Sequence, residues 1–331
     1  MPDLPLISVA LCTYEGERFL REQLESLLAQ DYPHLEIVAV DDASRDGTHA
    51  LLRSYAARDP RLRVHRNAAN LGLVRNFETA FRLCRGDLVA PCDQDDVWMP
   101  SKLSAMQAAL GDAPAVYCDS EIVDEAGRPQ GRRLSGRFRM APVLDPASFL
   151  LVNCISGHAL LFRRELLGRA LPVPEGVLHD WWLAFAACCA GRIEYCDRVL
   201  VRYRHHARAS TQGRWKGTAP EPPRAGRKLA TAVAVEARLR AFAAYPAAPD
   251  PVFFETALRL WLGWKEHFVS PRLVAFLLRH RRRIFGFRPD ERARHVRYAL
   301  RYLWGLRLKR LLRPRAYRPA PLRAGTGSAA P

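Results

Sequence analysis

Residues 36–48 read EIVAVDDASRDGT and contain a complete change of structure within thirteen positions. The apolar, β-branched run from Glu36 to Val40 predicts a buried strand. Asp41 and Asp42 end that run, and residues 44–46 supply side-chain oxygens that can cap a helix continuing to about Ala57. The stretch therefore predicts a strand, a polar loop and a helix in direct succession, which is the repeating unit of an α/β fold.

The same alternation extends over the first 120 residues. We expect further strands at 6–11, 62–65, 87–91 and 115–118, and further helices at 17–29, after 70–72 and at 100–110. Strands that alternate with helices form βαβ units, so the fold class is α/β with a mostly parallel sheet flanked by helices. Apolar runs at 157–162 and 199–203 complete the predicted sheet, and a buried helix begins near Asp180.

Two acidic clusters follow predicted strands. They are Asp41-Asp42 and Asp93-Gln94-Asp95-Asp96, and in open parallel sheets ligands bind at the carboxyl ends of the strands. Neighbouring carboxylates repel one another unless a positive charge neutralises them. Oxygen ligands suit hard ions that also bind substrate phosphates, so we expect Mg²⁺ or Mn²⁺ with a diphosphate substrate. A capped turn before the helix at Pro100 is the structural alternative for the second cluster.

Basic residues are concentrated in the last part of the chain. The 331 residues carry a net charge of +17, but residues 1–200 hold 22 basic and 27 acidic side chains, whereas residues 201–331 hold 29 basic and 7 acidic ones. Such segregation suggests a region that meets an anionic surface, either nucleic acid or a membrane leaflet. An Arg- and Ala-rich composition is the alternative explanation, although it accounts for abundance and not for segregation.

The region from Arg294 to Arg313 has the pattern of one amphipathic helix. A period of 3.6 residues separates an apolar side (Val296, Leu300, Leu303, Leu311) from a basic side (Arg294, Arg297, Arg301). The rings of Tyr298, Tyr302 and Trp304 are of the kind that lies at lipid headgroups. We therefore expect this helix to lie on a membrane surface.

Length and patterning predict four segments. They are a catalytic domain at 1–206, a Pro- and Gly-rich linker or mobile loop at 207–228, a basic helical region at 229–318 and a disordered tail at 319–331. The sequence shows neither a run of 18 apolar residues nor a secretory signal, so we expect a cytoplasmic protein. The eight cysteines lack Cys-x-x-Cys spacing and are expected to be reduced and buried.

Several of these stretches resemble the inverting family-2 glycosyltransferases of the GT-A fold. Residues 9–16 (VALCTYEG) resemble the opening strand and nucleotide loop, residues 40–48 the D-D-x-S-x-D-x-T segment, and Asn70-Leu71-Gly72 with Arg75-Asn76 the N-x-G stretch. Residues 93–98 (DQDDVW) resemble the metal motif. Residues 178–182 (LHDWW) and 203–206 (YRHH) are similar to late motifs of rhamnosyltransferase-like members, so the resemblance extends to about residue 206.

The resemblance implies roles for individual residues. Thr13, Glu15 and Asp42 fall in the nucleotide-binding segments, Arg75 lies near the diphosphate, and Asp93 and Asp95 form the metal motif with Asp95 as the direct ligand. His206 completes the metal or phosphate shell. Asp180 becomes the catalytic base, and the neighbouring rings of Trp181 and Trp182 could stack on a sugar. For Asp180 a helix N-cap is the structural alternative, and for His206 an ordinary exposed histidine.

The implied activity is metal-dependent transfer of a sugar, with rhamnose from a dTDP donor as the specific expectation and UDP- or GDP-sugars as alternatives. The acceptor would be a saccharide or a lipid-linked saccharide in bacterial-type surface polysaccharide synthesis, presented at the inner face of the plasma membrane to a peripherally bound enzyme. Gln212-Gly213-Arg214-Trp215 is one residue short of the Q-x-x-R-W motif of processive synthases, which favours single addition.

Two rival functions stay open. A metal-dependent phosphatase would use an acidic nucleophile motif, although Val97 and Trp98 fit that motif poorly. A nucleic-acid-binding protein would explain the basic C-terminal region and its aromatic residues. It would leave the acidic clusters unexplained, so no nucleic-acid partner is expected.

Overall fold

The first 92 residues of the chain form the parallel half of the sheet. The computed structural model describes residues 4–206, 227–288 and 292–312, with the backbone only at 227 and 228. Strands β1 (Ile7–Thr13), β2 (Leu35–Asp41), β3 (Leu62–Arg66) and β4 (Leu88–Cys92) lie in the order β3-β2-β1-β4, all parallel. Helices α1 (Glu17–Leu28), α2 (Thr48–Ala56) and α3 (Leu73–Leu83) connect them. The strands and helices predicted for this half are confirmed.

The second half of the sheet is mixed and not mostly parallel. Strand β8 (Leu160–Arg163) lies antiparallel between β4 and β6 (Ala115–Val123), and β9 (Ile193–Arg204) lies parallel to β6. The short strand β5 (Val97–Trp98) pairs antiparallel with β9, and β7 (Pro129–Arg133) pairs with β6. Strand β8 runs opposite to its neighbours because a β6–β7 hairpin and short turns precede it, in place of a crossover helix.

Two hydrophobic cores cover the two faces of the sheet. Val9 and Leu11 face α1, α2 and α4 (Lys102–Leu110), whereas Ala10 and Cys12 face α3 and α6 (His179–Ala190). This alternation follows from the two-residue period of a strand, and both faces are apolar because the parallel strands are buried on both sides. A short helix α5 (Leu167–Ala170) precedes α6. All eight cysteines are free, and seven of them are buried.

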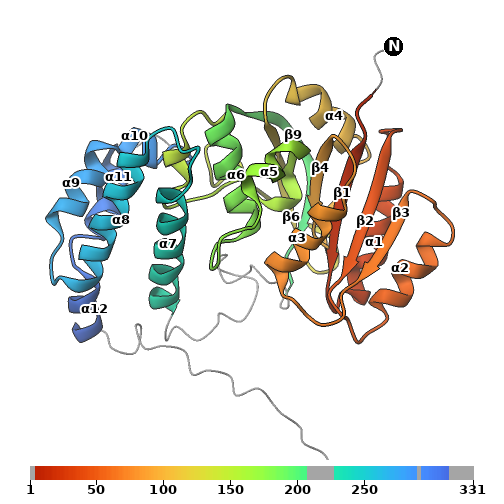
Figure 1. Ribbon diagram of the computed structural model, residues 1–331, viewed down its shortest axis with the longest axis horizontal. Helices are drawn as coiled ribbons and strands as arrows, with labels where there is room; N and C mark the ends of the chain where they lie inside the picture. The colour runs from red at the N-terminus through yellow and green to blue at the C-terminus, as the bar shows by residue number, and fades with distance from the viewer. Residues whose placement is uncertain (1–3, 207–226, 289–291, 313–331) are drawn as a thin grey trace, which may run out of the picture.

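The C-terminal helices pack on α6 and share its core. They are α7 (Arg227–Ala243), α8 (Pro251–Glu266), α9 (Pro271–Arg279), α10 (Arg281–Ile284), α11 (Arg292–Leu300) and α12 (Leu306–Leu312). Figure 1 shows α6 between the sheet and this group of helices. The ring of Phe185 in α6 stacks on Phe242 of α7 at 3.7 Å and meets the edge of Phe254 of α8 at 5.4 Å. The basic helical region is therefore continuous with the core of the sheet domain.

Truncating the aromatic stack should destabilise the whole protein. Phe185 is fully buried, so Phe185→Ala is expected to lower the free energy of unfolding by about 3–5 kcal/mol. Val252→Ala is the control, because Val252 is exposed and its truncation should change stability by about 0.5 kcal/mol or less. Urea unfolding measures both. If the helices only rested loosely on α6, the two variants would unfold alike.

The single amphipathic helix predicted for 294–313 is wrong. Helix α11 ends at Leu300 and α12 begins at Leu306. Between them Gly305 donates from its backbone N to Phe268 O at 2.8 Å, and a Cβ on Gly305 would lie 1.8 Å from His267 O. This close approach needs glycine and ends the helix. Tyr302 packs on Trp261 at 5.5 Å, so its ring faces the protein interior.

The remaining segment boundaries lie partly outside the described residues. The predicted linker at 207–228 is described only from Arg227, where α7 begins. The end of the basic region beyond Leu312, the tail at 319–331 and the Gln212–Trp215 near-match lie outside the described residues. Within the described part of the chain, we find no helix with the length and hydropathy that crossing a bilayer requires.

Candidate active site

The loops that follow β1, β2 and β4 are joined into one rim at the carboxyl edge of the sheet. Gln94 accepts from Tyr14 N at 2.8 Å and donates from Nε2 to Tyr14 O at 3.0 Å. Glu15 donates from its backbone N to Ser44 Oγ at 3.0 Å, and Arg45 N donates to Glu15 Oε1 at 2.8 Å. Glu15 has a φ of 49°, a left-handed conformation that is uncommon for a residue other than glycine. Hydrogen bonds across the rim hold that conformation in place.

The Asp42 carboxylate holds the loop after β3. Its Oδ1 accepts from Leu71 N at 2.8 Å and from Asn67 Nδ2 at 2.7 Å, and its Oδ2 accepts from Gly72 N at 2.9 Å. Asp42 is buried, and so is Thr13, whose Oγ1 lies 3.4 Å from Asp41 Oδ1. The geometry assigns Asp42 a positioning role in this rim, and a direct contact with a nucleotide stays a prediction.

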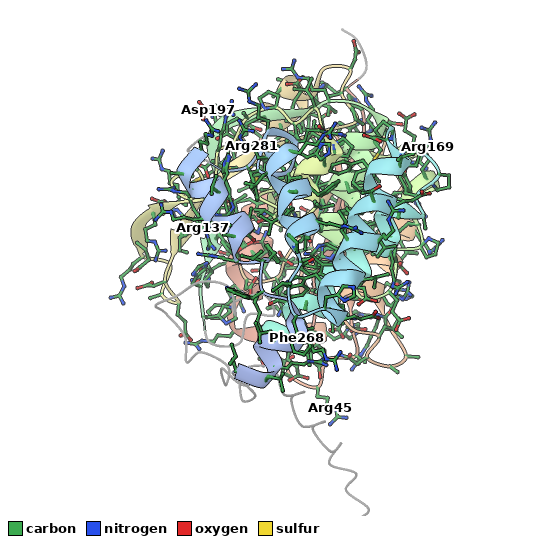
Figure 2. All side chains as sticks on the ribbon, turned by 90° about the vertical axis from the view of Figure 1, so that its left-hand side faces the viewer. Arg45, Arg137, Arg169, Asp197, Phe268 and Arg281 are labelled. Carbon is green, nitrogen blue, oxygen red and sulfur yellow. The ribbon has the colours of Figure 1, made fainter. Side chains whose placement is uncertain are left out.

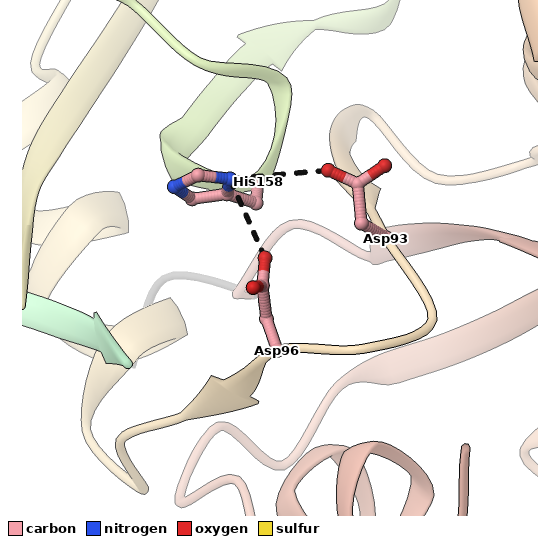
Figure 3. A group of neighbouring side chains, drawn as sticks. All are labelled: Asp93, Asp96 and His158. Carbon is pink, nitrogen blue, oxygen red and sulfur yellow. Dashed lines mark ion pairs between the residues drawn. The ribbon is translucent and has the colours of Figure 1, made fainter. Parts of the chain in front are cut away.

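Three titratable side chains meet beneath the rim (Figure 3). His158 Nδ1 lies 3.4 Å from Asp96 Oδ2 and 3.8 Å from Asp93 Oδ2, and one ligand atom of each residue lies within 4.8 Å of the others. Asp96 is fully buried, and its Oδ1 accepts from Arg204 N at 3.0 Å. The Asp93 side chain is 37% exposed. Asp93 is therefore the member of this cluster that solvent and a ligand can reach.

Burial and charge shift the protonation of this cluster in opposite directions. Burial raises the pKa of Asp96, and the nearby carboxylates of Asp95 and Asp93 raise it further. Burial disfavours the charged form of His158, but the carboxylates of Asp96 and Asp93 outweigh it and raise the pKa of His158. Burial likewise opposes ionisation of Asp93, but hydrogen bonding and charge from His158 hold its pKa below the ordinary value. Asp93 and His158 thus each favour the charged form of the other.

Asp95 and His206, predicted as metal ligands, lie side by side. His206 Nε2 is 2.7 Å from Asp95 Oδ2, with side-chain exposures of 7% and 16%. The pairing of Val97 with Arg202 between β5 and β9 brings the end of β9 to the acidic loop. Phe19 of α1 packs against the imidazole of His206, with the ring centroids 4.6 Å apart. Residues more than 100 positions apart in the sequence thus meet at one place.

Asp180 lies in the first turn of α6. It is half-buried, and its Oδ1 accepts from Trp181 N at 2.6 Å. A Cβ on Gly157, the residue before His158, would lie 3.6 Å from Asp180 Cβ and 3.1 Å from His179 Nε2. The imidazole of His179 stacks on Phe77 at 3.8 Å, and burial lowers its pKa. Asp180 therefore adjoins the segment that carries His158.

The expectation that Trp181 and Trp182 could stack on a sugar is wrong. Both rings are buried, and their Nε1 atoms donate to Phe149 O at 2.7 Å and to Ala170 O at 2.6 Å. Arg238 of α7 lies over the Trp181 ring at 3.7 Å. Their side of α6 faces the C-terminal helices, so the two tryptophans belong to the core.

Arg75 lies near the start of α3, after the loop that Asp42 holds. Its guanidinium pairs with Glu78 at 2.8 and 2.7 Å, and Glu78 Oε1 also accepts from Val173 N at 2.5 Å. About half of the Arg75 side chain is exposed. The structure places Arg75 at the rim, and a contact with a diphosphate stays a prediction.

The chemistry of these side chains fits a divalent cation. Asp93, Asp95 and Asp96 offer carboxylate oxygens, and His158 and His206 offer imidazole nitrogens. Asp96 Oδ2 is buried and accepts no hydrogen bond from any described residue. Carboxylates with imidazole are a donor set that divalent ions accept.

Comparison with known proteins shows the family of the chain. Residues 8–170 match the family model described as glycosyl transferase family 2. An uncharacterized glycosyltransferase of Haemophilus influenzae is 33% identical over 223 residues, which cover 62% of this chain and 67% of that protein. The chain belongs to glycosyl transferase family 2.

More distant relatives extend the comparison. An uncharacterized protein of Mycobacterium tuberculosis is 29% identical over 61% of this chain, and the chain spans 59% of the length of that relative. The crystal structure of Staphylococcus aureus TarS 1–349 in complex with UDP-GlcNAc has a TM-score of 0.60 at 17% identity and covers 95% of this chain and 93% of that one. At this identity the likeness shows the fold alone, which is GT-A.

Arg204 ties the acidic loop after β4 to its surroundings. The side chain is 2% exposed, and it donates from Nε to Asp95 O at 2.9 Å, from one terminal nitrogen to Glu125 O at 3.0 Å and from the other to Glu22 Oε2 at 2.6 Å. Its guanidinium also lies over the Phe19 ring at 5.0 Å. One arginine therefore fixes the backbone of the acidic loop against α1 and the end of β9.

Removing the Arg204 guanidinium should loosen the site. Arg204→Met leaves buried carbonyl oxygens unpaired, so we expect a loss of about 2–4 kcal/mol in the free energy of unfolding. Nucleotide binding should weaken as well, because Asp95 loses its support. Arg202→Met is the matched control, since Arg202 is exposed two residues earlier on β9. Equal stability and equal nucleotide affinity in the two variants would contradict this role.

Lys102 is a buried cation beneath the same loop. Its Nζ donates to His158 O at 2.7 Å and lies 2.9 Å from the centroid of the Trp98 ring. Burial lowers the pKa of Lys102 to about 7. In sequence, Lys102 looks like an ordinary lysine near the start of a helix. Its burial follows from the packing of α4 against the acidic loop.

Sequence reasoning missed three residues of the site, namely His158, Lys102 and Arg204. Asp96 was visible in the acidic motif, although its greater burial was not. Arg204 adjoins the His205-His206 pair and could have been suspected from that proximity. His158 and Lys102 carried no signal in the sequence, because each is isolated in an apolar segment.

Proposed function

We propose that this protein is an inverting glycosyltransferase that moves a sugar from a nucleoside diphosphate donor to a hydroxyl group of a saccharide or lipid-linked saccharide. The observation that carries this proposal is that Asp95 pairs with His206 and Asp93 with His158 at the carboxyl edge of the sheet, with Asp180 beside Gly157, the residue before His158. Bacterial-type surface polysaccharide synthesis is the proposed context.

The donor would bind along the rim. Thr13 at the end of β1, and Glu15 and Asp42 in the loops after β1 and β2, would hold the nucleoside, and Arg75 would face the diphosphate. Asp95 and His206, together with Asp93, would hold Mg²⁺ or Mn²⁺. Asp93 and Asp95 are the more exposed carboxylates of the loop, whereas Asp96 and His158 lie deeper and would orient them.

The bound ion would offset the negative charge of the departing nucleoside diphosphate. Asp180 would accept the proton of the acceptor hydroxyl while that oxygen bonds to the anomeric carbon and the bond from this carbon to the diphosphate oxygen breaks. Attack from the side opposite the leaving group inverts the anomeric centre. Asp180 is suited to this task because it is half-buried in the first turn of α6, next to the segment that carries His158.

The sugar and the nucleotide are finer parts of the proposal. Rhamnose carried by dTDP is our first candidate because of the late sequence motifs, and UDP is the second because TarS, which shares the fold, was solved with UDP-GlcNAc. The basic C-terminal helices would keep the enzyme at the inner face of the plasma membrane, where a lipid-linked acceptor would be available.

Calorimetry with UDP, dTDP and GDP, each with and without Mn²⁺, tests the proposal. We expect one nucleotide to bind in a metal-dependent manner. The identity of that nucleotide limits the possible donors to the sugars that it carries. Binding of none of the three under either condition would contradict the proposed donor site.

A further inference from the structure

We propose that one end of the C-terminal helices is a docking surface for an anionic lipid bilayer. We define this docking surface as Phe268, Val269, Trp304 and the exposed side of α12 (Arg307, Arg310, Leu311, Leu312). The inference rests on the proposed function only for its purpose, which is to bring the enzyme to a lipid-linked acceptor. Its physical basis is independent of the donor site.

Large apolar side chains gather at this surface. Phe268, Val269 and Trp304 are 43%, 48% and 51% exposed, and Leu311 and Leu312 are 66% and 72% exposed. With Leu300, six of the twelve exposed large apolar side chains in the described part of the chain fall between residues 268 and 312. Scattered exposed apolar residues are ordinary, whereas clusters mark interaction surfaces.

Backbone contacts join these residues into one surface. Val269 and Trp304 form an antiparallel bridge, and Gly305 N donates to Phe268 O at 2.8 Å. Helix α12 starts from this junction, with Leu306 buried and Leu311 and Leu312 exposed at its far end. The apolar side chains therefore continue from the α8–α9 loop along α12.

Basic side chains border the apolar ones. Residues 301–312 include Arg301, Arg307, Lys309 and Arg310 and no acidic residue. The Arg307 guanidinium lies over the Phe268 ring at 4.9 Å. Glu266, at the end of α8, is the nearest acidic residue before Phe268 in the sequence. Aromatic and leucine side chains flanked by arginine suit the boundary between acyl chains and anionic headgroups, whereas a nucleic acid offers no partner for the leucines.

The docking surface and the loop after β2, which forms part of the rim, lie at the same end of the molecule. Figure 2 shows Phe268 and Arg45 at the lower end, and Arg281 and Arg169 at the upper end. Arg45 belongs to the loop after β2 that forms part of the rim. Figure 1 shows α12 at the lower end of its helices and α10 at the upper end. A bilayer at the docking surface would therefore lie at the end of the molecule where the loop after β2 contributes to the rim.

Vesicle flotation of the full chain tests the surface. We expect wild-type protein to bind phosphatidylcholine vesicles that contain phosphatidylglycerol, and to bind pure phosphatidylcholine vesicles more weakly. The double variant Leu311→Asp with Leu312→Asp should lose about tenfold in affinity for the anionic vesicles, which corresponds to about 1.4 kcal/mol. Val252→Asp is the control, because Val252 is 68% exposed at the opposite end of α8 from Phe268.

Replacing arginine by glutamate at two places distinguishes binding through this surface from general electrostatic attraction of a basic protein to anionic vesicles. Arg307→Glu with Arg310→Glu should abolish binding to anionic vesicles, whereas Arg281→Glu with Arg282→Glu, in α10, should leave most of it. Equal losses in the two double variants would overturn the proposal, because net charge would then explain binding. Equal wild-type binding to neutral and anionic vesicles, or binding to neither, would also overturn it.

The other occupants of this surface are distinguishable outcomes. Binding to RNA or DNA in place of vesicles, weakened by the Leu311 and Leu312 variant, would assign the surface to nucleic acid. If sedimentation shows a wild-type dimer and this variant is a monomer, the surface would be assigned to a second copy of the chain. Either result would overturn bilayer docking. Calorimetric nucleotide binding checks that the variant is folded. If wild-type protein binds vesicles but no nucleotide, the docking surface stands while the proposed function fails.

Discussion

Asp180→Asn is expected to reduce sugar transfer by about 10²–10⁴-fold, because an amide cannot accept the proton of the attacking hydroxyl. The substitution preserves size and leaves an oxygen that can accept from Trp181 N, so the start of α6 should keep its structure. Nucleotide affinity should stay near the wild-type value, since Asp180 is proposed to contact the acceptor side. A fall in kcat with unchanged nucleotide Kd is thus the expected signature.

Asp197→Asn is the matched control for this experiment. Asp197 is exposed on β9, where its carboxylate accepts a hydrogen bond from the hydroxyl of Tyr195 at 3.1 Å. It should leave transfer unchanged. If Asp180→Asn retained transfer within about tenfold of the wild type, the main general base would have to be another group.

Asp95→Asn is expected to remove most of the metal-dependent part of nucleotide binding and to reduce transfer by at least about 100-fold, because charge stabilisation by a bound ion is worth several kcal/mol. His206→Ala should act in the same direction, since His206 Nε2 lies 2.7 Å from Asp95 Oδ2. Raising the Mn²⁺ concentration should partly restore nucleotide binding in whichever of the two variants has the weaker affinity for the metal. Calorimetry with the nucleotide and manganese measures both effects.

Asp112→Asn serves as the control for charge alone, because Asp112 is an exposed carboxylate just beyond the end of α4. It should bind nucleotide and metal as the wild type does. Metal-dependent binding that survives in Asp95→Asn would show that other groups hold the ion. Asp93, Asp96 and His158 would then be the candidates, since their ligand atoms already lie close together.

Local pattern was sufficient for half of the fold. The strands β1 to β4 and the helices between them were predictable because each has its own period and its own boundary signals, such as Asp41-Asp42 after β2. The strand directions in the mixed half of the sheet were not predictable in this way. Strand β8 follows a hairpin and short turns, and nothing in residues 157–162 indicates that this strand runs antiparallel to β4.

The break between α11 and α12 has a similar cause. Most apolar and basic positions of residues 294–313 follow a helical period, with Arg307 as the exception, so the sequence pattern predicts one helix. Gly305 approaches the backbone at His267 too closely for any side chain, and this contact with the α8–α9 loop ends the pattern. Contact with a segment far away in the sequence outweighed local periodicity.

The sequence by itself determined the βαβ half of the sheet and the acidic residues at its carboxyl edge, because strand period, capping residues and motif spacing are local properties. Only the tertiary structure decided that Asp95 meets His206, that His158 lies between Asp93 and Asp96, and that Arg204 and Lys102 support them. These side chains come from β9, α4 and the turn before β8. Which residues meet there depends on strand order and direction, and those follow from burying the whole core rather than from any one segment.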